Sequence, residues 1–473
     1  MFTGHSPTAP DPTSGTGTGR RTVLDQAVRR AVRDGLLDSP APVVGLLDVD
    51  GVRETVARLH AAFDSPAPVL HTFAAKACGL VPVLRLLADA GMGCEVASPG
   101  ELEQALAAGF TPERLVFDSP AKTVEELELA LDLGIAINLD NWQELERVDA
   151  LLAARPADRR APRGPVGLRV NPQVGAGAIG AMSTATDTSK FGIALRDPGA
   201  EDAVLAAFAR RPWLTRLHAH VGSQGCPLPL IASGVHATYR LAERINEAVG
   251  HRQIGSLDIG GGLPVNFADD EERPGYADYV AQLRTDVPGL FDGRYALVTE
   301  FGRSVLAKSG LVVTKVEYTK SSGGRPIAIT HAGAQVAART VFMPEAWPLR
   351  VGVFDAQGDP KSGPQVVQDV AGPCCFAGDL TAQARELPLM EPGDVVVLYD
   401  TGAYYFATHF AYNSLPRPAV YGFRVDDAGT ARFAPVREAQ TLAEIVAESG
   451  ARYADSLVGL LDPVPPEVPA CAS

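Results

Sequence analysis

One lysine stands out among the residues of this chain that could carry chemistry. Lys76 is one of only seven lysines in 473 residues, and it alone closes an apolar run, residues 69–77, that is typical of a buried strand. Burial lowers the pKa of an amine, and a neutral amine can attack a carbonyl carbon. The alternative is a structural lysine whose ammonium extends to solvent. Lys76 is therefore a candidate nucleophile.

A glycine run and a carboxylate follow two later strand-like segments. Gly260, Gly261 and Gly262 let backbone N–H groups approach and surround a phosphate, although a plain tight turn is the alternative. Arg303 is a candidate second contact to the same phosphate. Glu300, three residues earlier, can keep a pyridine nitrogen protonated, which makes the ring an electron sink. The alternative for Glu300 is a structural ion pair with Arg303.

Two histidines alternate on one strand-like segment, so the side chains of His218 and His220 point to the same side. A metal site needs a third ligand, and we find none at convincing spacing, so we predict no metal. An imidazole that lies flat against a planar cofactor is the better functional interpretation. The six cysteines contain no C-x-x-C pair, which argues against structural zinc or a disulfide framework and favours a cytoplasmic protein.

Strand-like and helix-like segments alternate between residues 66 and 305. The helix-like segments carry apolar residues at i, i+3 and i+4, and several end on glycine. Eight strands predict an α/β fold with a closed, TIM-like (β/α)8 barrel. An open doubly wound sheet is the alternative, but no G-x-G-x-x-G follows the first strand. The strand candidates are residues 69–77, 93–98, 114–119, 135–140, 166–171, 216–223, 256–261 and 296–302.

Polar residues occur at nearly every strand end, which is where barrel enzymes carry their chemistry. Each residue alone is equally well explained as the polar start of a loop. Together they favour one shared site. These residues are Lys76, Glu95, Ser119, Asp140, Arg169, His220, Gly260–Gly262 and Glu300.

The composition of the chain excludes some classes of partner and indicates where its domains begin and end. The formal net charge of −14, without a Lys/Arg run, disfavours nucleic acid and anionic lipid. No apolar run approaches the ~20 residues that cross a bilayer, and residues 1–20 lack the apolar core of a secretory signal. We expect a disordered tail at 1–22, a barrel at 46–305, a mostly β C-terminal domain at 306–455 and an irregular tail at 456–473.

Eight collinear motifs carry a family resemblance between about residues 40 and 425. They are FAAKA, CEVASPGELE, LRVNP, HAHVGSQ, DIGGG, EFGR, GPCCFAGD and DTGAY. In this order they resemble the fold-type III pyridoxal-phosphate decarboxylases, chiefly the diaminopimelate decarboxylase branch and more distantly ornithine decarboxylase. The resemblance implies pyridoxal 5′-phosphate as cofactor, an amino acid as substrate, and a homodimer with active sites shared across its interface. It also implies that residues 23–45 pack with the β-domain.

The motifs carry over site residues one by one. Lys76 matches the lysine that holds the cofactor as a Schiff base, and Glu95 matches an acid near it. His220 matches the imidazole stacked on the cofactor ring, and Glu300 matches the carboxylate on the pyridine nitrogen, although EFGR replaces the usual EPGR. Cys375 matches a cysteine of the partner subunit that helps to return a proton. Arg169 matches a residue near the phenolic oxygen, and the phosphate contacts are matched by Ser223, Gly260, Gly261, Gly262, Arg303 and Tyr404.

Four positions bear on the substrate. Phe376 stands where the diaminopimelate branch has an acidic residue, and His331 begins HAG where that branch has DGG. In the resembling enzymes, acids at or near these places meet a distal ammonium, which opposite Phe376 would be buried without a partner. Arg339 aligns with an arginine that meets a distal carboxylate, and Met343 replaces a usual tyrosine.

We therefore expect α-decarboxylation of a specialised amino acid with a distal carboxylate or carbonyl and no distal amine. A substrate tethered to an acyl carrier protein and meso-diaminopimelate itself are the alternatives. An alanine-racemase-like enzyme shares the barrel, the lysine and the β-domain, but it has an arginine at the pyridine nitrogen, so Glu300 favours decarboxylation. A non-catalytic homologue is disfavoured because Lys76, Glu300 and Cys375 are all present.

Overall fold

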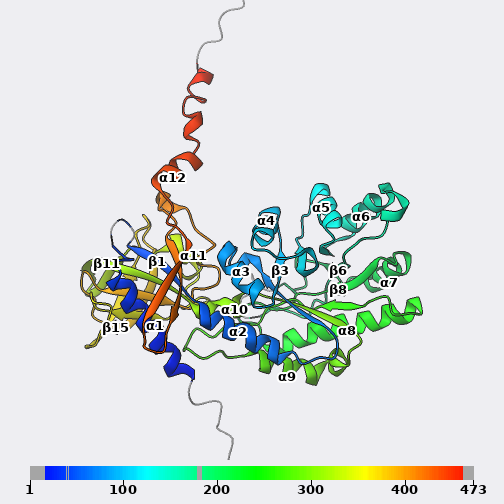
Figure 1. Cartoon of the computed structure of the whole chain (residues 1–473), viewed down its shortest axis with the longest axis horizontal. Helices are drawn as coiled ribbons and strands as arrows, with labels where there is room; N and C mark the ends of the chain where they lie inside the picture. Colours follow the sequence, from blue (N-terminus) through cyan, green and yellow to red (C-terminus); the bar gives the residue numbers. More distant parts are fainter. Residues whose placement is uncertain (1–15, 39, 41, 178–183, 462–473) are drawn as a thin grey trace, which may run out of the picture.

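A closed barrel of eight parallel strands forms one part of the molecule (Figure 1). The computed structural model describes residues 16–38, 40, 42–177 and 184–461. The strand order is β5-β4-β3-β2-β10-β9-β8-β6, and pairing of β5 with β6 closes the barrel. The predicted fold class is confirmed. The barrel strands are β2 (Val69–Ala74), β3 (Gly93–Val96), β4 (Leu115–Asp118), β5 (Ala136–Leu139), β6 (Val166–Asn171), β8 (Leu214–His218), β9 (Ser256–Asp258) and β10 (Ala296–Phe301). The short strand β7 (Ile193–Ala194) pairs in parallel with the end of β6.

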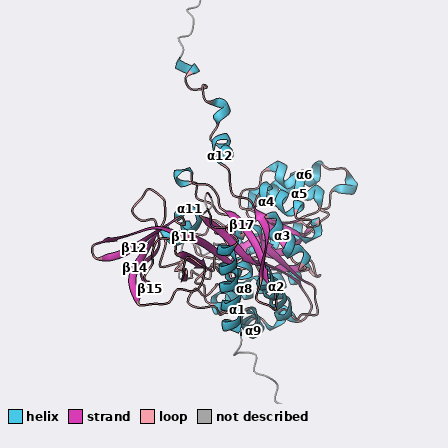
Figure 2. Cartoon of the chain, turned by 60° about the vertical axis from the view of Figure 1, so that its left-hand side comes forward, coloured by secondary structure: helices cyan, strands magenta, loops and turns pink. Residues whose placement is uncertain are grey.

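Helices connect successive strands and lie around the barrel (Figures 1 and 2). Local sequence fixes their ends, as in α5, where Thr123 and Glu126 form a capping box and Gly134 closes the helix at a φ of 78°. The helices are α2 (Val49–Ala62), α3 (Val81–Asp89), α4 (Pro99–Ala107), α5 (Val124–Leu133), α6 (Trp142–Ala154), α7 (Ala200–Arg210), α8 (Leu228–Val249), α9 (Tyr276–Asp286) and α10 (Arg303–Leu306).

A mostly β second domain is built from both ends of the chain. Strand β1 (Val43–Asp48) pairs with β11 on one side and with β17 on the other. Helix α1 (Thr16–Arg33) packs Leu24, Ala27 and Val28 into the core of this sheet. The further strands are β11 (Gly310–Ser322), β12 (Arg325–Thr330), β13 (Val351–Phe354), β14 (Gln365–Ala371), β15 (Leu380–Pro388), β16 (Val395–Tyr399), β17 (Ala419–Val425) and β18 (Ala431–Arg437), with helices α11 (Ala334–Phe342) and α12 (Leu442–Glu448).

The N-terminal boundaries differ from those expected. Helix α1 begins at Thr16, inside the tail expected at residues 1–22, because its buried apolar face anchors it to the sheet. Residues 1–15 lie outside the described part of the chain. The expected barrel boundary at residue 46 falls within β1, whose pairing partners belong to the β-domain. None of the described helices combines the length and apolar character that crossing a membrane requires.

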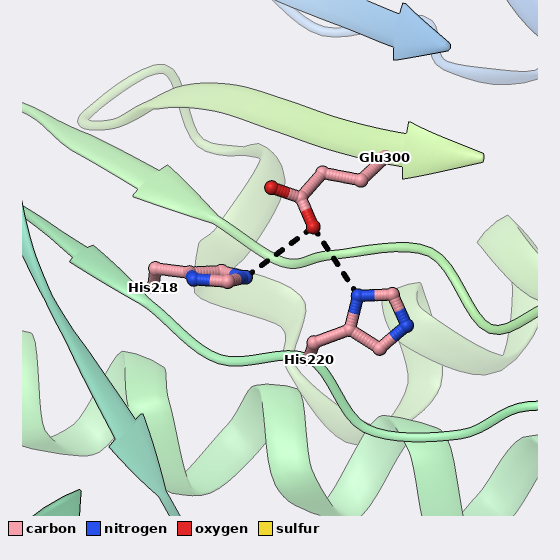
Figure 3. Close-up of side chains that lie close together, drawn as sticks. All are labelled: His218, His220 and Glu300. Atoms are coloured by element: carbon pink, nitrogen blue, oxygen red, sulfur yellow. Dashed lines mark hydrogen bonds and ion pairs between the residues drawn. The ribbon is translucent and has the colours of Figure 1, made fainter. Parts of the chain in front are cut away.

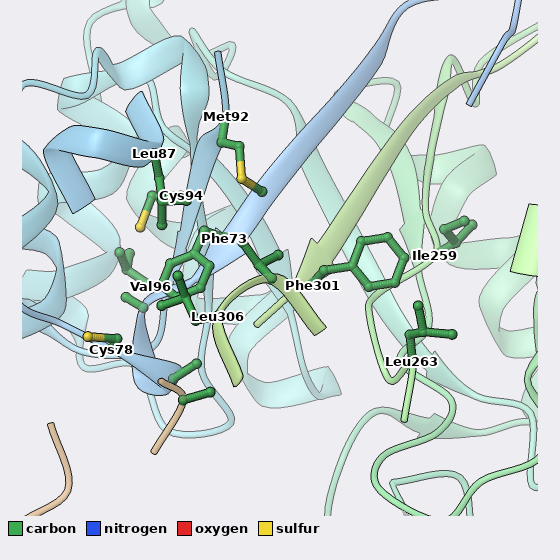
Figure 4. Packing of buried hydrophobic residues seen from close by; sticks show 14 of the residues in the cluster. Phe73, Cys78, Leu87, Met92, Cys94, Val96, Ile259, Leu263, Phe301 and Leu306 are labelled. Atoms are coloured by element: carbon green, nitrogen blue, oxygen red, sulfur yellow. The ribbon is translucent and has the colours of Figure 1, made fainter. Parts of the chain in front are cut away.

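Packing against the helices decides which side chains face the barrel interior. Phe301 on β10 belongs to the buried apolar core (Figure 4). Its ring points outward from the barrel and meets those of Tyr276 and Tyr279 on α9 at 5.2 and 5.6 Å. Because side chains alternate along a strand, the preceding residue, Glu300, faces inward. Phe73 is paired with Phe301 in the β2–β10 register and belongs to the same core. The apolar pattern of β10 therefore aims its carboxylate at the site.

A buried ion cluster joins the two domains. Asp400, after β16, lies 3.3 Å from Lys308 Nζ and accepts from Arg350 Nη2 at 2.8 Å, and Arg350 Nη1 pairs with Asp270 of the barrel. The side chain of Asp400 is fully buried and that of Lys308 is 4% exposed. Removing one partner from such a cluster leaves an uncompensated buried charge. The cluster therefore holds β-domain residues in a fixed position beside the barrel mouth.

Candidate active site

The C-terminal ends of the barrel strands border a cavity of about 600 Å³ that also reaches the β-domain. Its lining brings together most of the residues that the sequence predicts for one site. Glu95 lies beside this lining and contacts Lys76. The predicted residues that line the cavity are Lys76, Arg169, His220, Ser223, Gly262, Glu300, Arg303, Arg339 and Tyr404.

Lys76 lies in a single helical turn, Ala75–Ala77, directly after β2, and its Nζ donates to Glu95 Oε2 at 2.9 Å. Burial acts to lower the pKa of Lys76, but the charges of Glu95, Tyr404 and Glu300 outweigh it and raise the pKa. The expectation that burial leaves this amine neutral is therefore wrong, because an acid lies within hydrogen-bond distance. Burial raises the pKa of Glu95 to about 8 despite the ammonium. The Glu95 carboxyl can thus gain or lose a proton near neutral pH.

Glu300 forms the centre of a second buried group (Figure 3). Its Oε2 lies 3.2 Å from His220 Nδ1 and 3.4 Å from His218 Nε2. Burial acts to raise the pKa of Glu300, but the two imidazoles hold it well below its usual value. Burial also acts to lower the pKa of His218, yet Glu300, Asp118 and Asp258 raise it to about 9. The network therefore contains an ionised Glu300 and a protonated His218 at neutral pH.

His220 differs from His218 in protonation. Burial lowers its pKa, so the imidazole is neutral and carries one proton. Its Nδ1 lies 3.2 Å from the ionised Glu300 Oε2 and 3.4 Å from the Gly261 backbone N–H. Atoms of His218, His220 and Glu300 lie within 4.8 Å of one another, a spacing that a metal ion could bridge. A protonated His218 is a poor metal ligand, because the imidazole must be neutral to bind.

Two further features fit a pyridoxal phosphate ring and its phosphate. Glu300 Oε1 is buried and has no hydrogen-bond partner among the described residues, so it can accept from a protonated pyridine nitrogen. Gly262 lines the cavity at a φ of 86°, where a Cβ would lie 2.8 Å from the Gly222 oxygen. The role of Gly260 is conformational, at a φ of 65°, because its N–H already donates to Asp258 Oδ1 at 3.1 Å.

Arg169 lines the same cavity and is held in place by two contacts. Its Nη1 donates to Asp118 Oδ2 at 2.9 Å, and its guanidinium carbon lies 4.3 Å from the centre of the Phe191 ring. Burial acts to raise the pKa of Asp118, but Arg169 and His218 lower it overall. Both acids that line the cavity, Asp118 and Glu300, are therefore ionised and already paired with cations.

Two other cations have no such partner. Arg303, from the start of α10, lies 4.1 Å from the ring centre of Trp347 and 4.5 Å from that of Tyr404. Arg339, from α11, lies 5.3 and 4.1 Å from the same two rings. Within the described residues neither guanidinium pairs with a carboxylate, and Nη1 of each is buried without a hydrogen-bond partner. The two arginines form a ready site for an anion.

Besides Glu95, Gly260 and Gly261, four other residues that the motifs assign to the site do not line this cavity. His331 Nε2 contacts Glu317 Oε2 at 2.9 Å, and Met343 is 42% exposed. Cys375 is exposed, and its backbone N–H donates to Asn413 Oδ1 at 2.8 Å. Phe376 belongs to an exposed aromatic patch on the β-domain. We define this patch as Phe342, Phe376, Phe410 and Tyr412, whose rings contact one another at 5.4 to 5.7 Å between centres.

The sequence missed several residues that shape the site. Asp118 ends β4 and binds Arg169, Phe191 packs on Arg169, and Trp347 supports both unpaired arginines. Asp118 could have been found, since it lies one residue before Ser119 at a strand end. Trp347 follows α11 in an irregular segment, and no periodicity marks such a residue.

A (β/α)8 barrel joined to a β-domain, with an amine at the barrel mouth, is the architecture of fold-type III pyridoxal-phosphate enzymes. The family model for the pyridoxal-binding domain of pyridoxal-dependent decarboxylases matches residues 49–307. Diaminopimelate decarboxylase of Pseudomonas fluorescens is 35% identical over 384 residues, which cover 80% of this chain and 86% of that protein. The enzyme of the same name from Methanothermobacter thermautotrophicus is 31% identical over 394 residues, covering 81% and 87%.

Solved structures agree with these sequence matches. Helicobacter pylori diaminopimelate decarboxylase complexed with L-lysine aligns with a TM-score of 0.75 at 25% identity, covering 89% of this chain and 100% of that one. The chain belongs to the fold-type III pyridoxal-dependent decarboxylases, nearest their diaminopimelate decarboxylase branch. It is a pyridoxal-phosphate-dependent carboxy-lyase that acts on an amino acid.

Proposed function

We propose that this enzyme removes the α-carboxylate of an amino acid whose far end carries a carboxylate or a carbonyl group and no amine. The charge of the cavity carries the proposal. With Arg303 assigned to the cofactor phosphate, Arg339 is left as an unpaired cation of the lining, whereas Asp118 and Glu300 are already bound to the cations Arg169 and His218. A distal anion would find a partner in this lining, and a distal ammonium would not.

Different residues of the chain would hold the cofactor, protonate its ring and bind its phosphate. Bound pyridoxal phosphate supplies a ring that takes up the electron pair left when carbon dioxide departs. Lys76 is the amine placed to hold the cofactor, and Glu95 stores a proton beside it. Ionised Glu300 would accept from the ring nitrogen and keep it protonated. Neutral His220 would lie against the ring, and Ser223, Gly262, Arg303 and Tyr404 would hold the phosphate.

We propose that the site is completed in a homodimer by Cys375 and Phe376 of the partner subunit. Both residues lie on an exposed loop of their own chain and outside its cavity, which supports a role toward a second copy. Cys375 would return a proton to the decarboxylated carbon. Phe376 would place an aromatic face where an acid would be needed to bind a distal ammonium.

A decarboxylation panel tests the proposal. Release of carbon dioxide from the holoenzyme is measured with glutamate and aspartate derivatives, ornithine, lysine and meso-diaminopimelate, each as the free amino acid and tethered to an acyl carrier protein. We expect the highest kcat/KM for a substrate with a distal acid or carbonyl. A clear preference for lysine or ornithine would contradict the charge argument. A change of chirality without carbon dioxide would indicate a racemase.

Diaminopimelate decarboxylation is the second candidate function, and the names of the relatives favour it. That substrate carries a distal carboxylate, which Arg339 can bind, together with a distal amine. If meso-diaminopimelate is by far the best substrate, the interpretation of Phe376 is wrong and a different residue must meet the ammonium. The roles of Lys76 and Glu300 are the same in both functions.

A further inference from the structure

The C-terminal arm, which we define as residues 441–461, leaves the body of the molecule (Figures 1 and 2). It carries seven of the fifteen large apolar side chains that are exposed in the described part of the chain. Every residue from Ala451 to Leu461 is exposed. The seven are Leu442, Val446, Tyr453, Leu457, Val458, Leu460 and Leu461, at 57 to 82% exposure.

The helical structure of this arm is not expected to be stable in isolation. Helix α12 has seven residues, and its capping box, Thr441 with Glu444, satisfies only its first turn. Helices this short are unstable in water unless an apolar face packs against something. No described residue of the same chain covers the leucines after Gly450. The apolar side chains of the arm are therefore open to contact with a second molecule.

The base of the arm is fixed beside the active site. The backbone N–H of Gln440 donates to the Arg417 carbonyl oxygen at 2.9 Å, and Arg417 Nη2 donates to Glu448 at 3.1 Å. Thr441 and Glu444 line a groove of about 910 Å³ between the two domains, and Lys76 lies in the same groove. The arm thus starts from the wall of a passage that leads to the reactive amine.

The same stretch of chain links this base to the proposed dimer surface. Asn413, four residues before Arg417, accepts from the Cys375 backbone N–H at 2.8 Å. Tyr412 packs on Phe376 at 5.4 Å between ring centres. Residues 410–417 therefore run without interruption from the aromatic patch to the base of the arm. A molecule that covers Cys375 meets the arm at its edge.

We infer that the C-terminal arm packs on a second copy of this chain and clamps the dimer around the shared active sites. The inference rests on the dimer proposed above. A second copy offers exposed apolar residues, Phe342, Met343 and Phe410, and presents its own arm in return, as twofold symmetry requires. The arm itself is acidic, with Glu444, Glu448 and Asp455 against Arg452, which disfavours an anionic membrane as the occupant.

The test measures the dimer dissociation constant of the full-length holoenzyme by sedimentation. In Leu457→Asp/Leu461→Asp we expect dimerisation to be about 100-fold weaker, from about tenfold for each of two arms. Tyr318→Asp/Val367→Asp is the matched control, because these residues are 64 and 45% exposed on β11 and β14. We expect wild-type affinity for the control. Amide hydrogen exchange of residues 442–461 should slow as the wild-type protein dimerises.

Several outcomes overturn the inference. Wild-type dimerisation by the arm variant, equal weakening by the control, or arm amides that exchange fast in the dimer would each do so. A wild-type chain that stays monomeric, or an arm protected only when a carrier protein is added, would show that the occupant is not a second copy. Carbon dioxide release by the wild-type protein reports separately on the proposed function. An arm variant that still dimerises while Phe376→Asp separates the subunits refutes the arm and leaves the shared site intact.

Discussion

Replacing Glu300 by Gln tests whether one buried carboxylate sets the protonation of the active site. The variant keeps the size of the side chain but removes the charge that lies 3.4 Å from His218 Nε2 and 3.2 Å from His220 Nδ1. Without that charge, the pKa of His218 should fall from about 9 toward 6.5, because Glu300 is the largest of the three carboxylates that raise it against burial. Each pKa unit corresponds to about 1.4 kcal/mol, so the whole shift of His218 is worth about 3 kcal/mol.

The sign of the pH dependence follows from the raised pKa. The stabilisation by protonated His218 is fully present below pH 6.5 and is lost as the pH rises through about 9. The free energy of unfolding of the wild-type protein should therefore fall by about 3 kcal/mol across this window. That of Glu300→Gln should change little. Denaturant unfolding at a series of pH values measures both slopes.

Glu144→Gln is the matched control, because it removes another buried carboxylate, which lies 2.9 Å from Lys122 Nζ and outside the cavity. Glu144→Gln should lower the free energy of unfolding at every pH without changing how it depends on pH. The enzyme that remains folded should keep its kcat. Glu300→Gln should lower kcat by about 100-fold or more, as loss of a preorganised electrostatic contact does. Parallel slopes for wild type and Glu300→Gln, or an unchanged kcat, would refute the reasoning.

Three further experiments test other parts of the site. Arg339→Gln should raise KM for the distal-acid substrate by about 10- to 100-fold with a smaller effect on kcat, since one charged hydrogen bond is lost; steady-state kinetics with an equal effect on all substrates would contradict this. Lys76→Ala and Cys375→Ala should each be inactive, but a mixture of the two should recover about one quarter of wild-type activity if sites are shared in a twofold dimer; no recovery after subunit exchange would exclude sharing. Glu95→Gln should remove a group whose pKa is about 8, so the pH profile of kcat should lose any limb near pH 8, and an unchanged limb would assign it to another residue.

The barrel was predictable because its signals are local. Each strand is a short apolar run, and each helix has its own apolar periodicity and caps. In α5, for example, Thr123 and Gly134 define where the helix begins and ends. Parallel strands in a barrel end on one side, so strand order alone brings Lys76, Glu95, Arg169, His220 and Glu300 together. The family motifs then indicated which cofactor the site binds.

The electrostatics was not predictable, because it depends on contacts between distant segments. A lowered pKa was expected for Lys76, but its side chain is 42% exposed and Glu95, 19 residues away, raises the pKa. His218 was considered only as a metal ligand, and its protonation follows from three acids on three other strands. Helix α1 extends further toward the N-terminus than composition suggested, since its apolar face packs on a sheet assembled from both chain ends.

Substrate selection depends on how the two domains meet. Arg303 comes from the barrel and Arg339 from the β-domain, yet both stack on Tyr404 and Trp347 of the β-domain. Two guanidinium groups so close repel one another unless an anion lies between or beside them. The domain contact, including the buried Asp400 cluster, therefore maintains an arrangement that is favourable only when an anion binds. The anion that Arg303 and Arg339 are placed to bind at this domain contact is an anionic group of the cofactor or of the substrate.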